Sequence, residues 1–454
     1  MKRMTFAASF LVPFLAVAVA VAQQSVAPDT TTKLAEYMNA QVQVNRFSGS
    51  VLLAREGKIL FANGYGMANL EHKIPNTTST KFRLGSITKQ FTAAVILQLQ
   101  ERKRLSVEDS VCKYVDNCPE AWAPITIHHL LTHTSGIPNF TSFPDYQKTM
   151  MLASPPEKTV ERFRDKPLEF TPGERFSYSN SGYVLLGVII EKVTGQPYDR
   201  YLRENIFNPL GMHDTGYDWT ATVIPVRASG YERRGEGNYA NATFLDMTIP
   251  HAAGALYSTV EDFVKWEQAL WTEKILTRAS LDAMFKPFRG TYAYGWNVQD
   301  RAGRKVISHG GGIDGFNTSF MRYPDVKLFA VVFSNVQGTA VGRVAQDLAA
   351  IALGLPYELP RERVEIKVDS KILDGYVGRY EFSPTLSITI SREGEGLVVQ
   401  LTGQSKLQMF PESETKFFLR AVDAQISFVK DSDGRVTHLI LHQGGRDQKA
   451  KRLE

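Results

Sequence analysis

The feature that most constrains the fold is the position of the strand-like segments, which stand on both sides of a long helical stretch. Residues 47–69 alternate like two strands joined at Glu56-Gly57. Three more strand-like runs cover residues 304–335, after a middle of helical segments and loops rich in Pro and Gly. This order predicts one sheet assembled from both ends of the domain, with helices packed on it.

Helical segments are expected at three further places. Residues 31–43 show a short amphipathic pattern, residues 85–105 form a long apolar-faced helix that opens after Gly85, and a helix over residues 342–353 closes the domain. We expect this domain to cover residues 23–359.

The C-terminal part of the chain has a different character. Residues 360–374 are predicted to form a linker, and residues 375–454 a small all-β domain. Hairpin-like alternation with Gly-rich turns, including Asp433-Gly434, supports this interpretation. No catalytic role is predicted for this second domain.

The first residues indicate export. A basic start and a short apolar run lead to small residues ending at Ala22, so residues 1–22 predict a cleaved signal peptide. A retained membrane anchor is the alternative, and the shortness of the run and Pro13 argue against it. We therefore expect a periplasmic or secreted protein without a stable membrane span.

The charge distribution indicates which partners the protein can have, and the cysteines indicate the redox state of its compartment. The net charge of +5 is spread without a basic cluster, which argues against a nucleic-acid partner. Cys112 and Cys118 would meet an oxidising compartment after export. We favour a disulfide between them, with two free thiols as the alternative.

Two apparent binding motifs are excluded by the residues around them. Gly310, Gly312 and Gly315 have dinucleotide-fingerprint spacing, but a strand-like run follows them where that motif needs a helix. His129 and His133 stand four apart, but a zinc protease needs Glu where Leu130 stands, so we interpret them as structural or surface histidines. No metal or other cofactor is implied.

A serine and a lysine stand at the start of the long helix. Ser86 and Lys89 are three residues apart, so both would project from one face of its first turn. The free N–H groups there favour negative charge on the serine oxygen, and a desolvated lysine can accept the serine's proton. The same spacing recurs at Ser110/Lys113, Ser413/Lys416 and Ser427/Lys430. Only Ser86 opens a long apolar helix.

Two further elements carry polar groups suited to a cleft. Tyr178 and Asn180 stand in a loop at the start of an apolar helix that stops at Gly195. His309-Gly310-Gly311 ends a strand, where glycines let a ligand backbone lie along the strand edge. A hydrogen-bonded aromatic and a plain Gly-rich turn are the structural alternatives.

Taken together, these three elements in this order resemble the serine β-lactamase and penicillin-binding-protein superfamily, closest to its class C-like branch. The resemblance covers residues 34–355 and includes the phrases "HHLLTHTSGIP" and "YSNSGYVLLG". It implies an α+β fold, with an antiparallel sheet flanked by helices plus a helical subdomain. D-alanyl-D-alanine carboxypeptidases, D-aminopeptidases and esterases belong to that branch.

By that resemblance, Ser86 is the nucleophile, and Lys89 and Tyr178 share its activation. Asn180 would hold Lys89 and the substrate amide. Gly311 lies in the third motif, and the N–H groups of Ser86 and Gly312 would form the oxyanion hole.

His309 departs from the pattern of true class C β-lactamases, which have lysine at that position. A largely neutral histidine binds a substrate carboxylate less reliably than an ammonium does. We therefore predict a serine hydrolase with an acyl-enzyme on Ser86, acting on small-molecule or peptide amides or esters, including D-amino-acid-containing peptides. The alternatives are a β-lactam hydrolase and a non-catalytic penicillin- or peptidoglycan-binding relative. The sequence indicates no oligomeric state.

Overall fold

A computed structural model describes residues 28–235, 237–301, 303–383, 386–420, 422, 424–443 and 446–453. The predicted signal peptide, residues 1–22, lies outside the described residues. No helix in the described part of the chain is long and apolar enough to cross a membrane.

The core of the first domain is a six-stranded antiparallel sheet, in the order β10-β11-β12-β13-β1-β2. Its strands are β1 (Gly49–Arg55), β2 (Lys58–Tyr65), β10 (Asn297–Arg301), β11 (Arg304–Ile313), β12 (Phe316–Tyr323) and β13 (Leu328–Ser334). β1 pairs with β13, with Gly49 opposite Ser334. The prediction that both ends of the domain build one sheet is therefore confirmed.

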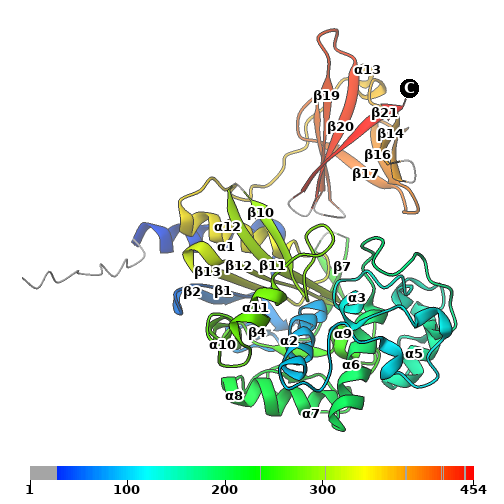
Figure 1. Cartoon of the computed structure of the whole chain (residues 1–454). Helices are drawn as coiled ribbons and strands as arrows, with labels where there is room; N and C mark the ends of the chain where they lie inside the picture. Colours follow the sequence, from blue (N-terminus) through cyan, green and yellow to red (C-terminus); the bar gives the residue numbers. More distant parts are fainter. Residues whose placement is uncertain are drawn as a thin grey trace, which may run out of the picture.

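Helices cover both faces of this sheet (Figure 1). α1 (Pro28–Asn45) and α12 (Val341–Leu353) pack on one face, where Leu34 and Leu348 meet Leu53 and Val332 in one buried cluster. α2 (Thr88–Glu101) packs on the other face, and all its residues from Thr88 to Leu99 are buried. The long apolar-faced helix predicted here is thus buried on every side, because other helices of the first domain cover the face turned away from the sheet.

Short helices and small sheets make up the rest of the first domain, including the helical subdomain (Figure 1). The helices are α3 (Ile127–Leu131), α4 (Tyr146–Thr149), α5 (Pro156–Arg164), α6 (Asn180–Thr194), α7 (Tyr198–Leu202), α8 (Asn208–Leu210), α9 (His251–Gly254), α10 (Asp262–Ala269) and α11 (Arg278–Met284). The strands are β3 (Met67–Asn69) with β4 (Ile74–Pro75), β5 (Phe82–Arg83), β9 (Leu256–Ser258) and β6 (Gly216–Tyr217) together, and β7 (Tyr231–Arg234) with β8 (Asn238–Asn241). A disulfide joins Cys112 and Cys118 in this region.

The C-terminal domain is a closed barrel in which strands adjacent in sequence are adjacent in space. Its strands are β14 (Gly378–Ser383), β15 (Leu386–Glu393), β16 (Gly396–Leu401), β17 (Leu407–Pro411), β18 (Lys416–Leu419), β19 (Ala424–Lys430), β20 (Val436–Gln443) and β21 (Arg446–Leu453). β14 pairs with β21 and closes the barrel, with Arg379 opposite Leu453. Apolar side chains fill the interior, as alternation along short strands predicts.

The segment between the two domains lies partly against the barrel. The N–H of Ile366 donates to the carbonyl of Pro411 at 2.9 Å, and Arg363 pairs with Glu412 at 2.5 Å. Residues Ser370–Asp374 form the short helix α13, whose Leu373 is buried in the barrel core. The end of the predicted linker is thus folded onto the second domain.

Candidate active site

Ser86 lies where the sheet and the helical subdomain meet. It belongs to a 3-10 turn, η1 (Gly85–Ile87), and α2 begins two residues later at Thr88. The predicted helix start at Ser86 is therefore a tighter turn, which then continues as α2. Ser86 is half-buried, so part of the residue remains accessible to solvent.

Glycines allow this turn to approach β11 closely. Gly85 has a φ of +54°, and a Cβ on it would lie 3.0 Å from the backbone nitrogen of Gly312. A Cβ on Gly311 would lie 2.0 Å from the carbonyl oxygen of Leu84. Larger residues at either position would push the strand away from Ser86, so these glycines hold the two segments together.

Lys89 is fully buried beneath Ser86, and its Nζ has three oxygen neighbours. It lies 3.1 Å from Ser86 Oγ, 2.9 Å from Asn180 Oδ1 and 2.8 Å from the carbonyl oxygen of Ala253. Burial lowers the pKa of Lys89 well below its usual value, which favours the neutral amine. A neutral amine can donate to the two carbonyl oxygens and keep its lone pair for the Ser86 proton.

Tyr178 and Asn180 lie at the start of α6, beside the Lys89 amine. The Lys89 Nζ is 4.9 Å from the ring centre of Tyr178. Burial raises the pKa of the Tyr178 phenol, and a hydrogen bond with Ser86 partly offsets this rise. Asn180 is fixed at its other end, because its Nδ2 donates to Thr141 Oγ1 at 3.2 Å and its N–H to Asn139 Oδ1 at 3.0 Å.

The third motif, His309-Gly310-Gly311, lies on β11, where one edge of the strand has no partner strand in the described structure. β12 pairs with β11 as far as Ile313, opposite Phe316, but β10 pairs with it only as far as Ser308. Residues 309–313 thus have a sheet partner on one side only in the described structure. This open edge adjoins Ser86, so the N–H groups of Ser86 and Gly312 come from adjacent segments.

His309 is only 5% exposed, and both of its ring nitrogens are engaged within the protein. Nδ1 lies 2.6 Å from the carbonyl oxygen of Gly310, so Nδ1 carries the proton and donates it. Nε2 then accepts from the hydroxyl of Tyr292 at 2.9 Å. Burial, helped by Lys89, lowers the pKa of His309 to about 3, so the ring is neutral.

Sequence reasoning missed two side chains that complete this cluster. The ring of His133 lies 4.2 Å from that of Tyr178 and 4.6 Å from that of Tyr292, measured between ring centres. His133 follows the end of α3 rather than sharing a helix face with His129. Among the residues described, no cluster of His, Cys, Asp or Glu side chains suited to a metal ion occurs. Tyr292 has no local signal, because only tertiary folding brings it to His309.

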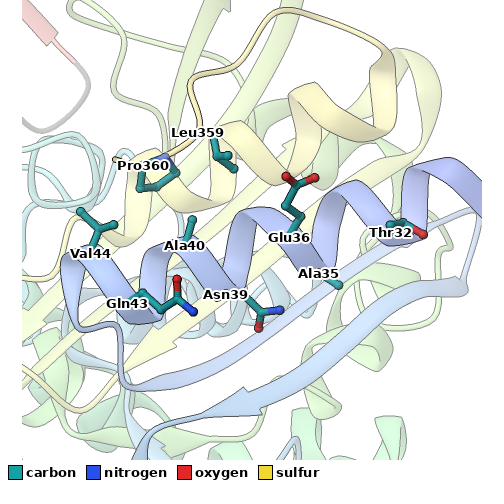
Figure 2. Close-up of a pocket in the computed structure, with 9 residues that line it drawn as sticks. All are labelled: Thr32, Ala35, Glu36, Asn39, Ala40, Gln43, Val44, Leu359 and Pro360. Atoms are coloured by element: carbon teal, nitrogen blue, oxygen red, sulfur yellow. The ribbon is translucent and has the colours of Figure 1, made fainter. Parts of the chain in front are cut away.

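A separate groove of about 500 Å³ runs between α1 and the end of the first domain (Figure 2). Thr32, Glu36, Asn39 and Gln43 give it polar edges, and Leu359 borders it opposite the helix. α1 covers the sheet face opposite α2, so this groove is remote from Ser86 and lacks the residues of the three motifs.

The arrangement around Ser86 can perform acyl transfer. It brings together an accessible hydroxyl, a buried amine with lowered pKa, a phenol, and an open strand edge of N–H groups. The five side chains expected from the sequence, those of Ser86, Lys89, Tyr178, Asn180 and His309, belong to this one region through the contacts above.

Comparison with known proteins agrees with the fold. The Beta-lactamase family model matches residues 31–354, and a domain of unknown function (DUF3471) matches residues 362–452. The chain is 32% identical over 442 residues to penicillin-binding protein 4* of Bacillus subtilis (strain 168), covering 90% of this chain and 96% of that protein.

Solved structures of a penicillin-binding protein homologue and of an amidase are also similar to this chain. The octameric penicillin-binding protein homologue from Pyrococcus abyssi is 28% identical, with a TM-score of 0.66 over 92% of this chain and 99% of that one. The D-amino acid amidase from Ochrobactrum anthropi SV3 is 25% identical, with a TM-score of 0.63 over 72% of this chain and 98% of that one. Hydrolases among these relatives support a hydrolase here. The chain therefore belongs to the β-lactamase family, within the class C-like branch of the serine β-lactamase and penicillin-binding-protein superfamily.

Proposed function

We propose that this protein is an exported serine hydrolase that forms an acyl-enzyme on Ser86 and acts on peptide amides or on esters. The observation that carries the proposal is the contact of the buried Lys89 amine with Ser86 Oγ, at 3.1 Å. A neutral amine fixed by two carbonyl oxygens is a suitable base for a serine nucleophile.

In the acylation step, Ser86 Oγ attacks the substrate carbonyl carbon while its proton passes to the neutral Lys89 amine, and the Tyr178 hydroxyl can relay that proton by giving up its own as it receives one. The N–H groups of Ser86 and Gly312 stabilise the oxyanion, each worth about 3 kcal/mol in comparable sites. The tetrahedral intermediate collapses, and the leaving amine or alcohol takes up a proton through Tyr178. An ester of Ser86 remains.

In the deacylation step, water attacks this ester and loses its proton to the same basic groups. Ser86 recovers its proton as the bond between the acyl group and Oγ breaks, and the product is a carboxylic acid. Within the protein, both steps move protons only among Ser86, Lys89 and Tyr178, while the leaving group takes up one proton and water supplies one.

The neutral third motif supports amides and esters over β-lactams. A penicillin presents a carboxylate near the reacting carbonyl, and the nitrogens of His309 are occupied by Gly310 and Tyr292. Asp314, half-buried in the turn that follows β11, adds a carboxyl group two residues after Gly312. This charge pattern suits a substrate amine better than a carboxylate, and the D-amino acid amidase relative is consistent with D-amino-acid-containing substrates.

The experiment is covalent labelling of the purified mature protein with a fluorophosphonate, followed by a panel of p-nitrophenyl esters, D-amino-acid amides, D-alanyl-D-alanine peptides and nitrocefin. We expect labelling that Ser86→Ala abolishes, and turnover of an ester or amide. Equal labelling of the Ser86→Ala protein would refute the nucleophile.

The same panel separates the alternatives. Nitrocefin hydrolysis faster than that of every ester and amide would establish a β-lactamase, and binding of peptidoglycan fragments without any turnover would establish a non-catalytic relative. A His309→Lys variant, which places a cation in the third motif, is expected to shift the preference toward carboxylate-bearing substrates.

A further inference from the structure

We propose that His133 is a positioning residue, which holds the Tyr178 phenol in place beside Ser86. This inference rests on the proposed function, because it concerns a residue that acts through Tyr178. His133 belongs to neither the three motifs nor the oxyanion hole, and the sequence offers it only as a structural or surface histidine.

His133 accepts two hydrogen bonds, from the residues on either side of Tyr178 in the chain. The N–H of Ser177 donates to the backbone carbonyl of His133 at 2.9 Å. The N–H of Ser179 donates to His133 Nδ1 at 3.2 Å. The residues on both sides of Tyr178 are therefore tied to one residue, which fixes the backbone from which the phenol projects.

The imidazole ring also restrains the phenol ring directly. The ring centres of His133 and Tyr178 are 4.2 Å apart, and the two planes are tilted by 38°. Lys89 lies over the same Tyr178 ring at 4.9 Å. With neighbours on the ring itself and at both backbone positions, the phenol has little freedom to turn away from Ser86.

The protonation state of His133 suits this role. Its exposure is 2%, and burial lowers the pKa of His133 well below the usual value. Because Nδ1 accepts from Ser179, the neutral ring carries its proton on Nε2. Nε2 is buried without a hydrogen-bond partner in the described structure. A buried, unpaired polar group of this kind lowers the free energy of unfolding.

The backbone of His133 is also unusual, with a φ of +56°. This left-handed conformation is uncommon for residues other than glycine, and asparagine tolerates it best among them. Asparagine also places an acceptor oxygen about where the histidine has Nδ1. His133→Asn therefore keeps the acceptor and loses the ring, whereas His133→Phe keeps a ring and loses the acceptor.

The test measures the rate at which a fluorophosphonate acylates Ser86, together with kcat and KM on an ester. We expect His133→Phe to lower the acylation rate and kcat by about 10- to 100-fold with little change in KM, because a small misplacement of a reacting group has effects of that size. His133→Asn is expected to recover most of the rate. His129→Asn, four residues earlier, is the matched control and should acylate like the wild type.

A double-mutant cycle separates positioning from general structure. If His133 acts through Tyr178, adding His133→Phe to Tyr178→Phe causes no further loss of acylation rate. Losses that multiply, or a wild-type rate in His133→Phe, would overturn the inference. If His133→Phe does not fold, the same cycle is run with His133→Ala, which loses both the ring and the acceptor and whose loss of rate must likewise be non-additive with Tyr178→Phe. A wild-type protein that never acylates on Ser86 would instead refute the proposed function.

Discussion

The barrel interior and the surroundings of Lys89 are both closed to solvent, but they are filled with different chemistry. The barrel core consists of aliphatic and aromatic side chains, with Phe428 stacked on Tyr376 at 4.0 Å. The interior near Ser86 holds Lys89, His133 and His309, each with its pKa lowered mainly by burial. Apolar filling stabilises a domain, whereas buried ionisable groups reduce stability in exchange for reactivity.

The first prediction concerns activity and has the largest expected effect. Lys89→Met and Tyr178→Phe should each lower kcat/KM on an ester by about 10³-fold or more, because both groups move the Ser86 proton. Phe428→Ala, in the barrel, should leave kcat/KM unchanged at temperatures where the barrel is folded. Steady-state kinetics on the three variants make the comparison, and near wild-type rates in both active-site variants would remove them from the catalytic set.

The second prediction concerns the stability of the barrel. Phe428 is 3% exposed, so its replacement by alanine should cost about 3–5 kcal/mol of unfolding free energy. Calorimetry should show a lowered transition for the barrel, while the transition that abolishes activity stays in place. If both transitions fall together, the two domains are not independent in stability and the contrast between them fails.

The third prediction concerns the partner of His309. Tyr292→Phe removes the donor to Nε2 and leaves a buried acceptor unpaired, at a cost of about 1–3 kcal/mol. Tyr294→Phe is the control, because Tyr294 bonds His128 at 2.7 Å and His128 is half-buried, whereas His309 is 5% exposed. Urea unfolding of the two variants should rank Tyr292→Phe as the less stable, and an equal cost would contradict the closed environment of His309.

The fourth prediction concerns the pH dependence of stability. Because the folded pKa of Lys89 is lowered, the unfolded state binds one more proton between that pKa and the usual 10.5, and stability rises with pH in this window. The slope is at most about 1.4 kcal/mol per pH unit for one proton. Lys89→Met should lose this part of the slope in urea unfolding between pH 6 and 9, and an unchanged slope would mean that Lys89 is charged in the folded state.

Local patterns predicted much of the fold. Strand-like runs over residues 47–69 and 304–335 predicted five of the six strands of the central sheet. The edge strand β10 (Asn297–Arg301) was missed. The closure of the barrel, where Arg379 of β14 meets Leu453 of β21, could not be predicted. A strand pattern shows which face is buried, but it does not show which distant strand provides the partner.

The residues of the candidate site likewise fall into those that local sequence predicted and those that only the folded structure shows. Ser86 with Lys89 and Tyr178 with Asn180 stand out because each pair lies close in sequence, at the start of an apolar helix. His133 and Tyr292 reach this cluster only through contacts across the fold, at 4.2 Å from Tyr178 and 2.9 Å from His309. Tyr292 stands in no local pattern, and His133 stands in the phrase "HHLLTHTSGIP", which gave its side chain no role in the site.

The most direct test of the central claim is mass spectrometry of the protein acid-quenched during turnover of a p-nitrophenyl ester, with the acyl group mapped to a peptide. We expect an acyl mass shift on the peptide that contains Ser86, and no shift in the Ser86→Ala protein. Turnover without any acylated peptide, or an acyl group on a different residue, would contradict the central claim.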